Sequence, residues 1–327
     1  MIGFMDTAGE RLQIECELPW VAKLLDEGAA GVIQPIRAAG ATVTVRVEAE
    51  RRPFETAGWQ LLTRGARASR REVVVENVLT SGFDMRARCV DDRAEFTLRW
   101  RPPTRERVVA RVLRSRFHLL ARAALLQYPV LWWAGVRGRV PVHASVCTTG
   151  SRTPLIASPS GIGRSTLVAA EIEAGGVATG DNLAVTDGTT VWGLVEPVRM
   201  SGLAGRKMPH GRGEAPLAAR SESLAPDAIV VMSRGDAHLA HMNGCSAETA
   251  ARSLVTSTYM AGELRRYWAF AATLAAGTGA GPAHPPVADV AEHLGAALPC
   301  YALALGEARS PRLAELMKDV QVEGAWA

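Results

Sequence analysis

The amino-acid sequence predicts an α/β protein in two domains, a smaller β-rich α+β domain over residues 1–135 and an α/β domain over 136–327. The first hundred residues alternate polar and apolar side chains in several short runs, a pattern typical of half-buried strands. After residue 140, strand-like and helix-like segments take turns, which is typical of an α/β domain. A chain of 327 residues, 48% of them hydrophobic, is long enough for two such cores.

The N-terminal domain is expected to hold an antiparallel sheet, because period-two alternation suits strands with one solvated face. The runs are "RLQIECEL", "ATVTVRVEAE", "REVVVENVL", "DMRARCV" and "AEFTLRW". From Thr104 to about Gln127, apolar residues recur at helical spacing and arginines take the other face. The following "YPVLWWAGVRGRVPVHASV" predicts a buried helix, a Gly-rich turn and a strand, and we expect the hinge between the domains here.

The second domain is predicted from alternating elements. The expected strands are 140–147, 153–158, 177–180, 183–187, 190–194, 228–233 and 299–305, and the expected helices are 164–174, 246–255, 259–274, 286–296 and 310–319. The segment "TGAGPAHPP" predicts a loop.

Composition excludes several classes of protein. The five cysteines are scattered and form no CxxC pair, so neither a zinc site nor a disulfide framework is predicted, and reduced thiols in a cytoplasm are expected. The N-terminus becomes charged too early for a secretory signal, and no apolar run reaches the roughly 18–20 residues of a membrane span. We therefore expect a cytoplasmic protein with no membrane partner.

The net charge of +4 is too mild to predict a nucleic-acid partner. Arginine is nevertheless dense between Arg51 and Arg116. This stripe is most simply a solvated face, and a nucleic-acid-binding module that uses it is a rival interpretation, which predicts binding with a steep salt dependence.

The segment "PLIASPSGIGRSTLVAA" places a loop between a strand and a helix, as a phosphate-binding loop requires. In such loops, backbone N–H groups and a lysine hold the phosphates and a hydroxyl binds Mg²⁺. The residues at these positions are Ser158, Ser160, Gly161, Ile162, Gly163, Arg164, Ser165 and Thr166. Ser158 stands in place of the first glycine and Arg164 in place of the lysine, so an ordinary strand-to-helix turn explains the loop about equally well.

Two flanking residues favour a site. His143 lies fifteen positions before Ser158, and Asp181 lies seventeen positions after Arg164, followed by Asn182. In open α/β sheets, ligands gather at the carboxyl ends of neighbouring strands. His143, the loop and Asp181 are therefore predicted to share one edge of the sheet.

This constellation resembles the HPr kinase/phosphorylase family, in which a histidine precedes a GxSGxGKS loop and a pair of aspartates follows the loop helix. The likeness covers residues 120–235 and the closing strand "LPCYALALG", is specific across 143–182, and extends to the shorter kinases encoded beside modified-peptide precursors. It implies a P-loop fold for the second domain and an ATP- and Mg²⁺-dependent kinase that phosphorylates a serine hydroxyl of a peptide or small protein, in a homo-oligomer.

The resemblance also implies roles for single residues. Asp181 matches the general base, and His143 matches the histidine near the transferred phosphoryl group. Ser165 matches the Mg²⁺ ligand, and Asn182 replaces the second aspartate, which leaves it as a weaker metal contact. Because Arg164 replaces the lysine, a nucleotide-binding scaffold or sensor without catalysis is the alternative function.

Two further expectations concern basic residues. His210 and Arg212 lie in the segment "GRKMPHGRGE", which follows Asp181 and Asn182 along the chain. They either contact phosphates or are solvated, and a solvated loop is the simpler interpretation. The basic N-terminal region, with Arg111 and Arg114, is predicted to dock an acidic leader segment of the peptide substrate.

Overall fold

The computed structural model describes residues 1–37, 39–200, 211–307 and 312–320. The protein is mixed α/β, with sheets of eight, five, four and two strands, which confirms the predicted class. The P-loop type of the second half and the boundary near residue 135 stay predictions. None of the helices in the described ranges is long and apolar enough to cross a membrane.

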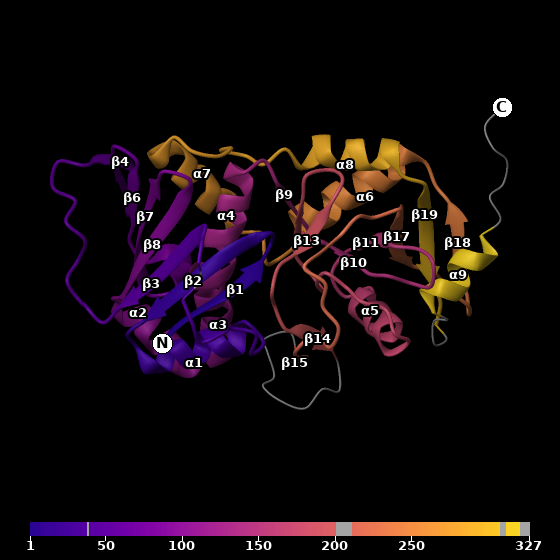
Figure 1. Cartoon of the computed structure of the whole chain (residues 1–327), viewed down its shortest axis with the longest axis horizontal. Coiled ribbons are helices and arrows are strands. Elements are labelled where there is room, and N and C mark those ends of the chain that lie inside the picture. The colour runs from indigo at the N-terminus through magenta and orange to yellow at the C-terminus, as the bar shows by residue number, and fades with distance from the viewer. Residues whose placement is uncertain (38, 201–210, 308–311, 321–327) are drawn as a thin grey trace.

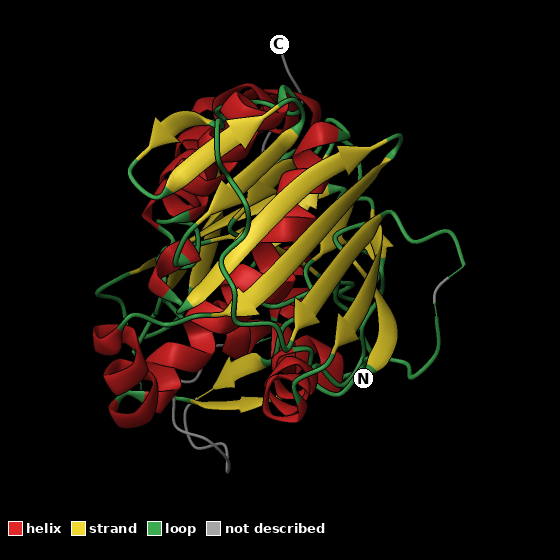
Figure 2. Ribbon diagram, turned by 90° about the vertical axis from the view of Figure 1, so that its left-hand side faces the viewer, coloured by secondary structure: helices red, strands yellow, loops and turns green. Residues whose placement is uncertain are grey.

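The first sheet has the order β1-β2-β3-β8-β7-β6-β5-β4, and Figure 2 shows its strands in front of the helices. The strands are β1 (Ile2–Thr7), β2 (Glu10–Cys16), β3 (Val43–Glu48), β4 (Gln60–Thr63), β5 (Ala66–Ser69), β6 (Glu72–Val75), β7 (Phe83–Val90) and β8 (Arg93–Trp100), with a 3₁₀ turn at Val78–Thr80. The expectation of antiparallel pairing throughout is wrong, because β3 runs parallel to both β2 and β8. Helix α1 (Pro19–Gly28), which the sequence analysis missed, supplies the crossover that the parallel pair β2–β3 requires.

The predicted helix over 104–127 is divided. Its parts are α2 (Thr104–Val112), α3 (Arg114–Arg122) and a π-helical turn (Ala123–Gln127), followed by α4 (Tyr128–Val136). The division falls at Leu113, whose φ of −109° and ψ of 56° are not helical. All residues of α4 from Tyr128 to Gly135 are buried, as expected of a helix that is apolar on every side.

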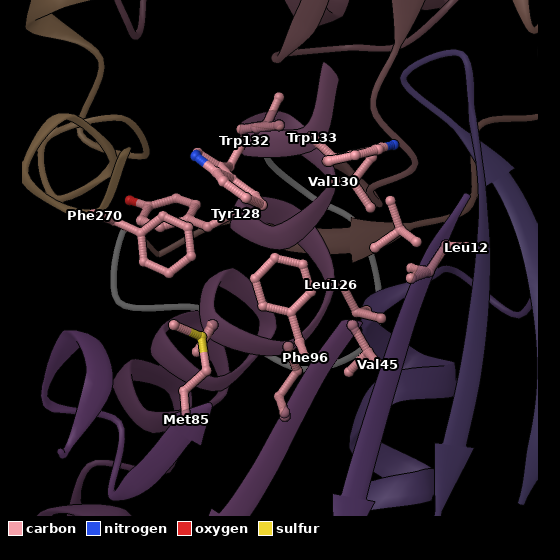
Figure 3. Packing of buried hydrophobic residues seen from close by; sticks show 14 of the residues in the cluster. Leu12, Val45, Met85, Phe96, Leu126, Tyr128, Val130, Trp132, Trp133 and Phe270 are labelled. Carbon is pink, nitrogen blue, oxygen red and sulfur yellow. The ribbon is translucent and has the colours of Figure 1, made fainter. Parts of the chain in front are cut away.

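The core of the first half lies between its sheet and these helices (Figure 3). Trp132 of α4 packs edge-on against Phe96 of β8, with ring centroids 5.8 Å apart. Helix α7 (Tyr267–Thr278), far along the chain, also joins this core through Phe270. Figure 1 shows α7 beside the strands of the first sheet, and a Cβ on its Gly277 would lie 2.3 Å from Val73 Cγ2.

The second half contains a five-stranded sheet of order β10-β11-β17-β19-β18 and a four-stranded sheet of order β16-β13-β12-β9. The strands are β9 (Val140–Val142), β10 (Ala144–Val146), β11 (Pro154–Ala157), β12 (Ala184–Thr186), β13 (Val191–Gly193), β16 (Ser223–Leu224), β17 (Ala228–Arg234), β18 (His241–Gly244) and β19 (Cys300–Leu305), with a separate pair β14 (Val198–Met200) and β15 (Gly213–Ala215). Strands β11, β17 and β19 are parallel, so their carboxyl ends share one edge. The loop after β11 lies at this edge.

The helices of this half are α5 (Arg164–Glu173), α6 (Ala247–Met260), α8 (Val287–Ala297) and α9 (Leu313–Asp319), with residues 310–311 of the last predicted helix outside the described ranges. The boundary between the helices predicted at 246–255 and 259–274 was placed too early, because α6 continues to Met260. The strand predicted at 177–180 is absent. Ala178 forms isolated bridges to Cys147 and Arg220, and the chain bends at Thr179, so no ladder develops.

Gly193 of β13 determines the path of the segment that leads to Asp181. A Cβ at Gly193 would lie 1.8 Å from the carbonyl oxygen of Thr179, a backbone atom that moves only with its segment. We expect Gly193→Ala to lower the free energy of unfolding by about 2–4 kcal/mol in urea denaturation. Gly244→Ala is the control, since a Cβ there meets nothing within 4 Å. Equal stabilities of the two variants would contradict this packing.

Candidate functional site

The loop between β11 and α5 depends on two glycines. Gly161 has φ of 87° and Gly163 has φ of 125°, both in the region that glycine favours. A Cβ on Gly163 would also lie 3.1 Å from Leu305 Cδ1, at the end of the parallel strand β19. Ser158 is buried, whereas Ser160 and Gly161 are exposed, so the tip of the loop faces solvent. The exposed loop tip therefore leaves the N-terminus of α5 accessible to a ligand from solvent.

The remaining loop residues differ in burial. Ile162 packs against the apolar cluster beneath α5. Ser165, in the first turn of α5, is partly exposed, and Thr166 is exposed. A hydroxyl at Ser165 therefore remains within reach of a bound phosphate or metal ion.

His143 lies at the bend where the chain passes from the four-stranded to the five-stranded sheet, between β9 and β10. Its backbone N–H donates to Thr258 Oγ1 at 3.1 Å, and the residue is 1% exposed. The pairing of β12 with β9 sets Ala184 opposite Val142, which brings the residues just before β12 next to His143. His143 Nε2 and Asn182 Oδ1 are consequently 2.8 Å apart.

Arg164 joins these segments. Its Nε donates to the carbonyl oxygen of Asp181 at 3.1 Å, and its NH1 nitrogen donates to the carbonyl oxygen of His143 at 3.1 Å. Its NH2 nitrogen lies 2.9 Å from His143 Nε2 and 3.0 Å from Asn182 Oδ1. The structure therefore brings together His143, Arg164, Asp181 and Asn182, which lie far apart in the sequence.

The direction of Arg164 differs from that of a phosphate-loop lysine. The residue is 6% exposed, and its guanidinium points into the protein, where its bonds to the neighbouring segments occupy it. Among the described residues, Arg212 is a cation beside the loop, with its NH2 nitrogen 3.7 Å from the position of a Cβ on Gly161. Contact of Arg212 with phosphates stays a prediction, and His210 lies outside the described residues.

The electrostatics of His143 follow from its surroundings. Burial, reinforced by the Arg164 charge, lowers the pKa of His143 to about 4. The ring is therefore neutral near pH 7, and its Nε2 lies within hydrogen-bond distance of both an Arg164 donor and the Asn182 Oδ1 acceptor. Burial likewise lowers the pKa of Arg164, although a guanidinium remains charged at physiological pH.

Several polar atoms at this site are buried and have no hydrogen-bond partner among the described residues. They are Thr179 Oγ1, His143 Nδ1, Asp181 Oδ1 and Asn182 Nδ2. The other oxygen of Asp181, Oδ2, accepts from the backbone N–H of Arg199 at 3.4 Å. Buried polar atoms without partners cost about 1–3 kcal/mol each, so their clustering here is typical of a place that bonds a further group.

Behind the site lies a buried ion cluster that sequence reasoning missed. Arg199 bonds to Glu263 and lies 3.6 Å from both Glu196 and Glu214. Glu214 in turn accepts two bonds from Arg122 of α3, at 3.0 and 2.8 Å. Burial raises the pKa of Glu196 to about 7. The Glu–Arg pair within the apolar run "GLVEPVRM" is the sequence signal that could have indicated this cluster.

The two predicted Mg²⁺ ligands differ in how well they suit a cation. Ser165 presents a partly exposed hydroxyl at the start of α5. Asn182 Oδ1 already accepts a bond from the Arg164 cation at 3.0 Å, which disfavours a metal ion at the same oxygen. The described residues contain no cluster of three or more His, Cys, Asp or Glu that could hold a metal. Mg²⁺ that accompanies nucleotide phosphates needs just one or two protein ligands, so Ser165 alone suits it.

His143 predicts a pH dependence of stability. Its pKa is about 4 when folded and 6.5 in the ordinary case, so the unfolded chain binds a proton below pH 6.5 while the folded protein does not. The neutral His143 ring therefore makes its full contribution to the free energy of unfolding above pH 6.5. About 3 kcal/mol of that contribution is lost as the pH falls towards 4. We expect the stability difference between the natural protein and His143→Gln to shift by this amount between pH 7 and 4 in urea denaturation. Comparing the two proteins cancels Glu196, whose raised pKa acts in the opposite direction. A constant difference would contradict the buried neutral ring.

Arg164 predicts a large cost for a conservative change. Lysine has a single nitrogen and cannot replace the fork that reaches His143, Asp181 and Asn182. We expect Arg164→Lys to lower the free energy of unfolding by about 2–4 kcal/mol. Arg152→Lys is the matched control, because Arg152 pairs with Asp227 at a half-exposed position and should cost under about 1 kcal/mol. Similar costs at both positions would show that Arg164 does not hold the site together.

Comparison with known proteins leaves the family open. The scan against protein-family models finds no match for this chain, and the search of curated proteins finds none either. The likeness to HPr kinases therefore rests on the motif residues and their spacing in the sequence, and it enters below as a proposal.

Proposed function

We propose that this protein binds ATP at the loop over 158–163 and is a phosphotransferase of the HPr kinase-like type, acting on a serine hydroxyl. One observation carries the proposal: His143, Asp181 and the N-terminus of α5 meet at the edge where the parallel strands of the second sheet end. That edge is where α/β sheets bind their ligands.

The phosphates would lie on the exposed tip of the loop. Backbone N–H groups at the start of α5, a helix of ten residues, face this position and favour an anion. Arg212, near Gly161, supplies the positive charge that Arg164 does not. Mg²⁺, held by the phosphates and the Ser165 hydroxyl, would neutralise charge on the transferred group.

In the transfer step, the oxygen of the acceptor serine attacks the γ-phosphorus of ATP and the bond to the ADP oxygen breaks. Asp181 takes the proton of the serine hydroxyl, a role for which its Oδ1, without a partner among the described residues, is suited. Neutral His143 lies next to Asn182 and holds the end of β9 in place through Arg164. By the resemblance, the acceptor is a peptide or small protein, such as a precursor in modified-peptide biosynthesis.

A nucleotide-binding scaffold or sensor without catalysis is the second candidate. Asp181 is 3% exposed and His143 1%, so an acceptor hydroxyl reaches neither side chain without a rearrangement. The inward bonds of Arg164 oppose such a rearrangement. Both candidates share the phosphate loop and differ in whether Asp181 contacts a substrate.

Asp181→Asn separates the two candidates. We expect ATP binding, measured by calorimetry, to change by less than about threefold, because a carboxylate offers the phosphates no hydrogen-bond donor. Transfer of label from γ-labelled ATP to serine-containing probe peptides with an acidic N-terminal segment should fall by about 10²–10³. Asp227→Asn is the control, since Asp227 lies just before β17, at the opposite end of the parallel strands.

Unchanged transfer by Asp181→Asn would remove Asp181 as the base. ATP binding by the natural protein without transfer, and without any gain in Arg164→Lys, would establish the scaffold. Absence of ATP binding would overturn both candidates.

A further inference from the structure

A basic cleft of about 940 Å³ lies in the first half of the protein, among α1, α2, α3 and the end of β8. The cationic side chains that line it are Lys23, Arg51, Arg101, Arg107, Arg111 and Arg114. The carboxylate among the described lining residues is Glu27. Arg101 is paired with Asp84, and the other five cations outnumber Glu27, so the cleft is positive, whereas the whole chain carries a net charge of only +4.

Helix α2, one wall of this cleft, lacks the packing that normally stabilises a helix. None of its nine residues is buried. Arg107 and Arg111 are one helical turn apart, a spacing at which like charges repel. A helix this short is marginal without tertiary contacts, so an anionic partner on this face would stabilise it.

The floor of the cleft is aromatic. Trp20 and Phe117 pack around Trp100, with ring centroids 5.2 and 5.4 Å from it. Trp20 is 43% exposed, so part of its ring is open to a ligand. On α2 itself, Ala110 lines the cleft beside Arg107 and Arg111. Cationic and apolar contacts are therefore offered side by side.

We propose that this cleft binds an acidic peptide segment in which carboxylates alternate with apolar residues. The carboxylates would pair with Arg107 and Arg111, one turn apart on α2, and with Arg114 at the start of α3, all three of which line the cleft. The apolar residues would pack on Trp20 and on Ala110 of α2, which line the cleft. Charge complementarity favours an anion.

A nucleic acid suits the cleft less well. Bases bind by stacking on open aromatic faces. Here Trp100 and Phe117 meet each other at 65°, edge to face, and Phe117 is 7% exposed. Their faces are consequently occupied within the protein. Trp20 is exposed, but one ring offers a place to stack for a single base and not for a run of bases.

Peptide binding in this cleft does not depend on phosphotransfer. That this peptide is the leader of the serine acceptor does rest on the proposed function. In that case, the first half of the chain recognises the substrate and the second half carries out the chemistry. Helix α3 connects them, because Arg114 and Phe117 line the cleft and Arg122 pairs with Glu214 of the buried ion cluster.

The test uses fluorescence anisotropy with a fluorescein-labelled peptide of about twelve residues, in which Asp and Glu alternate with Leu and Val. We expect the full-length protein to bind it, and the triple variant Arg107→Glu/Arg111→Glu/Arg114→Glu to bind at least tenfold more weakly. The control Arg64→Glu/Arg67→Glu/Arg71→Glu changes the net charge equally at exposed positions in the turn between β4 and β5, on β5 and in the turn before β6, and should bind within twofold of the natural protein. The neutral triple variant with Gln at 107, 111 and 114 should fall between them and guards against misfolding.

Three results would overturn the proposal: equal loss in both charge-reversed triple variants, binding of a matching peptide with Lys in place of the acidic residues, or tighter binding of single-stranded oligo(dT) that the cleft variant abolishes. The last would make the cleft a nucleic-acid site. ATP binding and label transfer to a short serine peptide without the acidic segment are measured on the same variants. If the proposed function fails, ATP binding and label transfer are missing while peptide binding by anisotropy persists. If the cleft proposal fails, ATP binding and label transfer persist while peptide binding in the cleft is missing.

Discussion

The hydrogen bonds of the Arg164 guanidinium are the constraint on which the candidate site depends. A buried cation is tolerated only where its donors meet acceptors, because desolvation otherwise costs several kcal/mol. The acceptors are the backbone oxygens of His143 and Asp181 and the side chains of His143 and Asn182. The start of α5, the bend between β9 and β10 and the approach to β12 are thereby held in one arrangement.

This arrangement divides the site into an outer and an inner part. The outer part is the exposed loop tip with Arg212, which suits phosphate. The inner part is a buried cluster in which His143 is neutral and Asp181 keeps an oxygen without a partner in the described ranges. In a phosphate loop with lysine, one cation would serve both parts. Here Arg164 bonds to the inner part, and the proposed function assigns phosphate binding to Arg212.

The two halves of the protein are joined by buried charge as well as by apolar packing. Arg122 of α3 and Arg199 of β14 share Glu214, and Arg199 also reaches Glu263 in the turn between α6 and α7. Helix α7 then continues into the core of the first sheet. A change at the basic cleft on α3 therefore has a physical route to the segment around Asp181, through ion pairs that are shielded from solvent screening.

The sequence by itself determined the mixed α/β class, most strands and helices of the second half, and the residues His143 and Asp181 on either side of the loop. It could do so because periodicity and motif spacing are local properties of a chain. The tertiary structure decided which strands pair in parallel, since α1 and its crossover lie between runs that look antiparallel. It also decided the direction of Arg164. An arginine at the start of a helix can reach either a phosphate or the protein interior. The choice depends on whether His143, Asp181 and Asn182 present acceptors within about 3 Å, and only the packing of β9 against β12 fixes that.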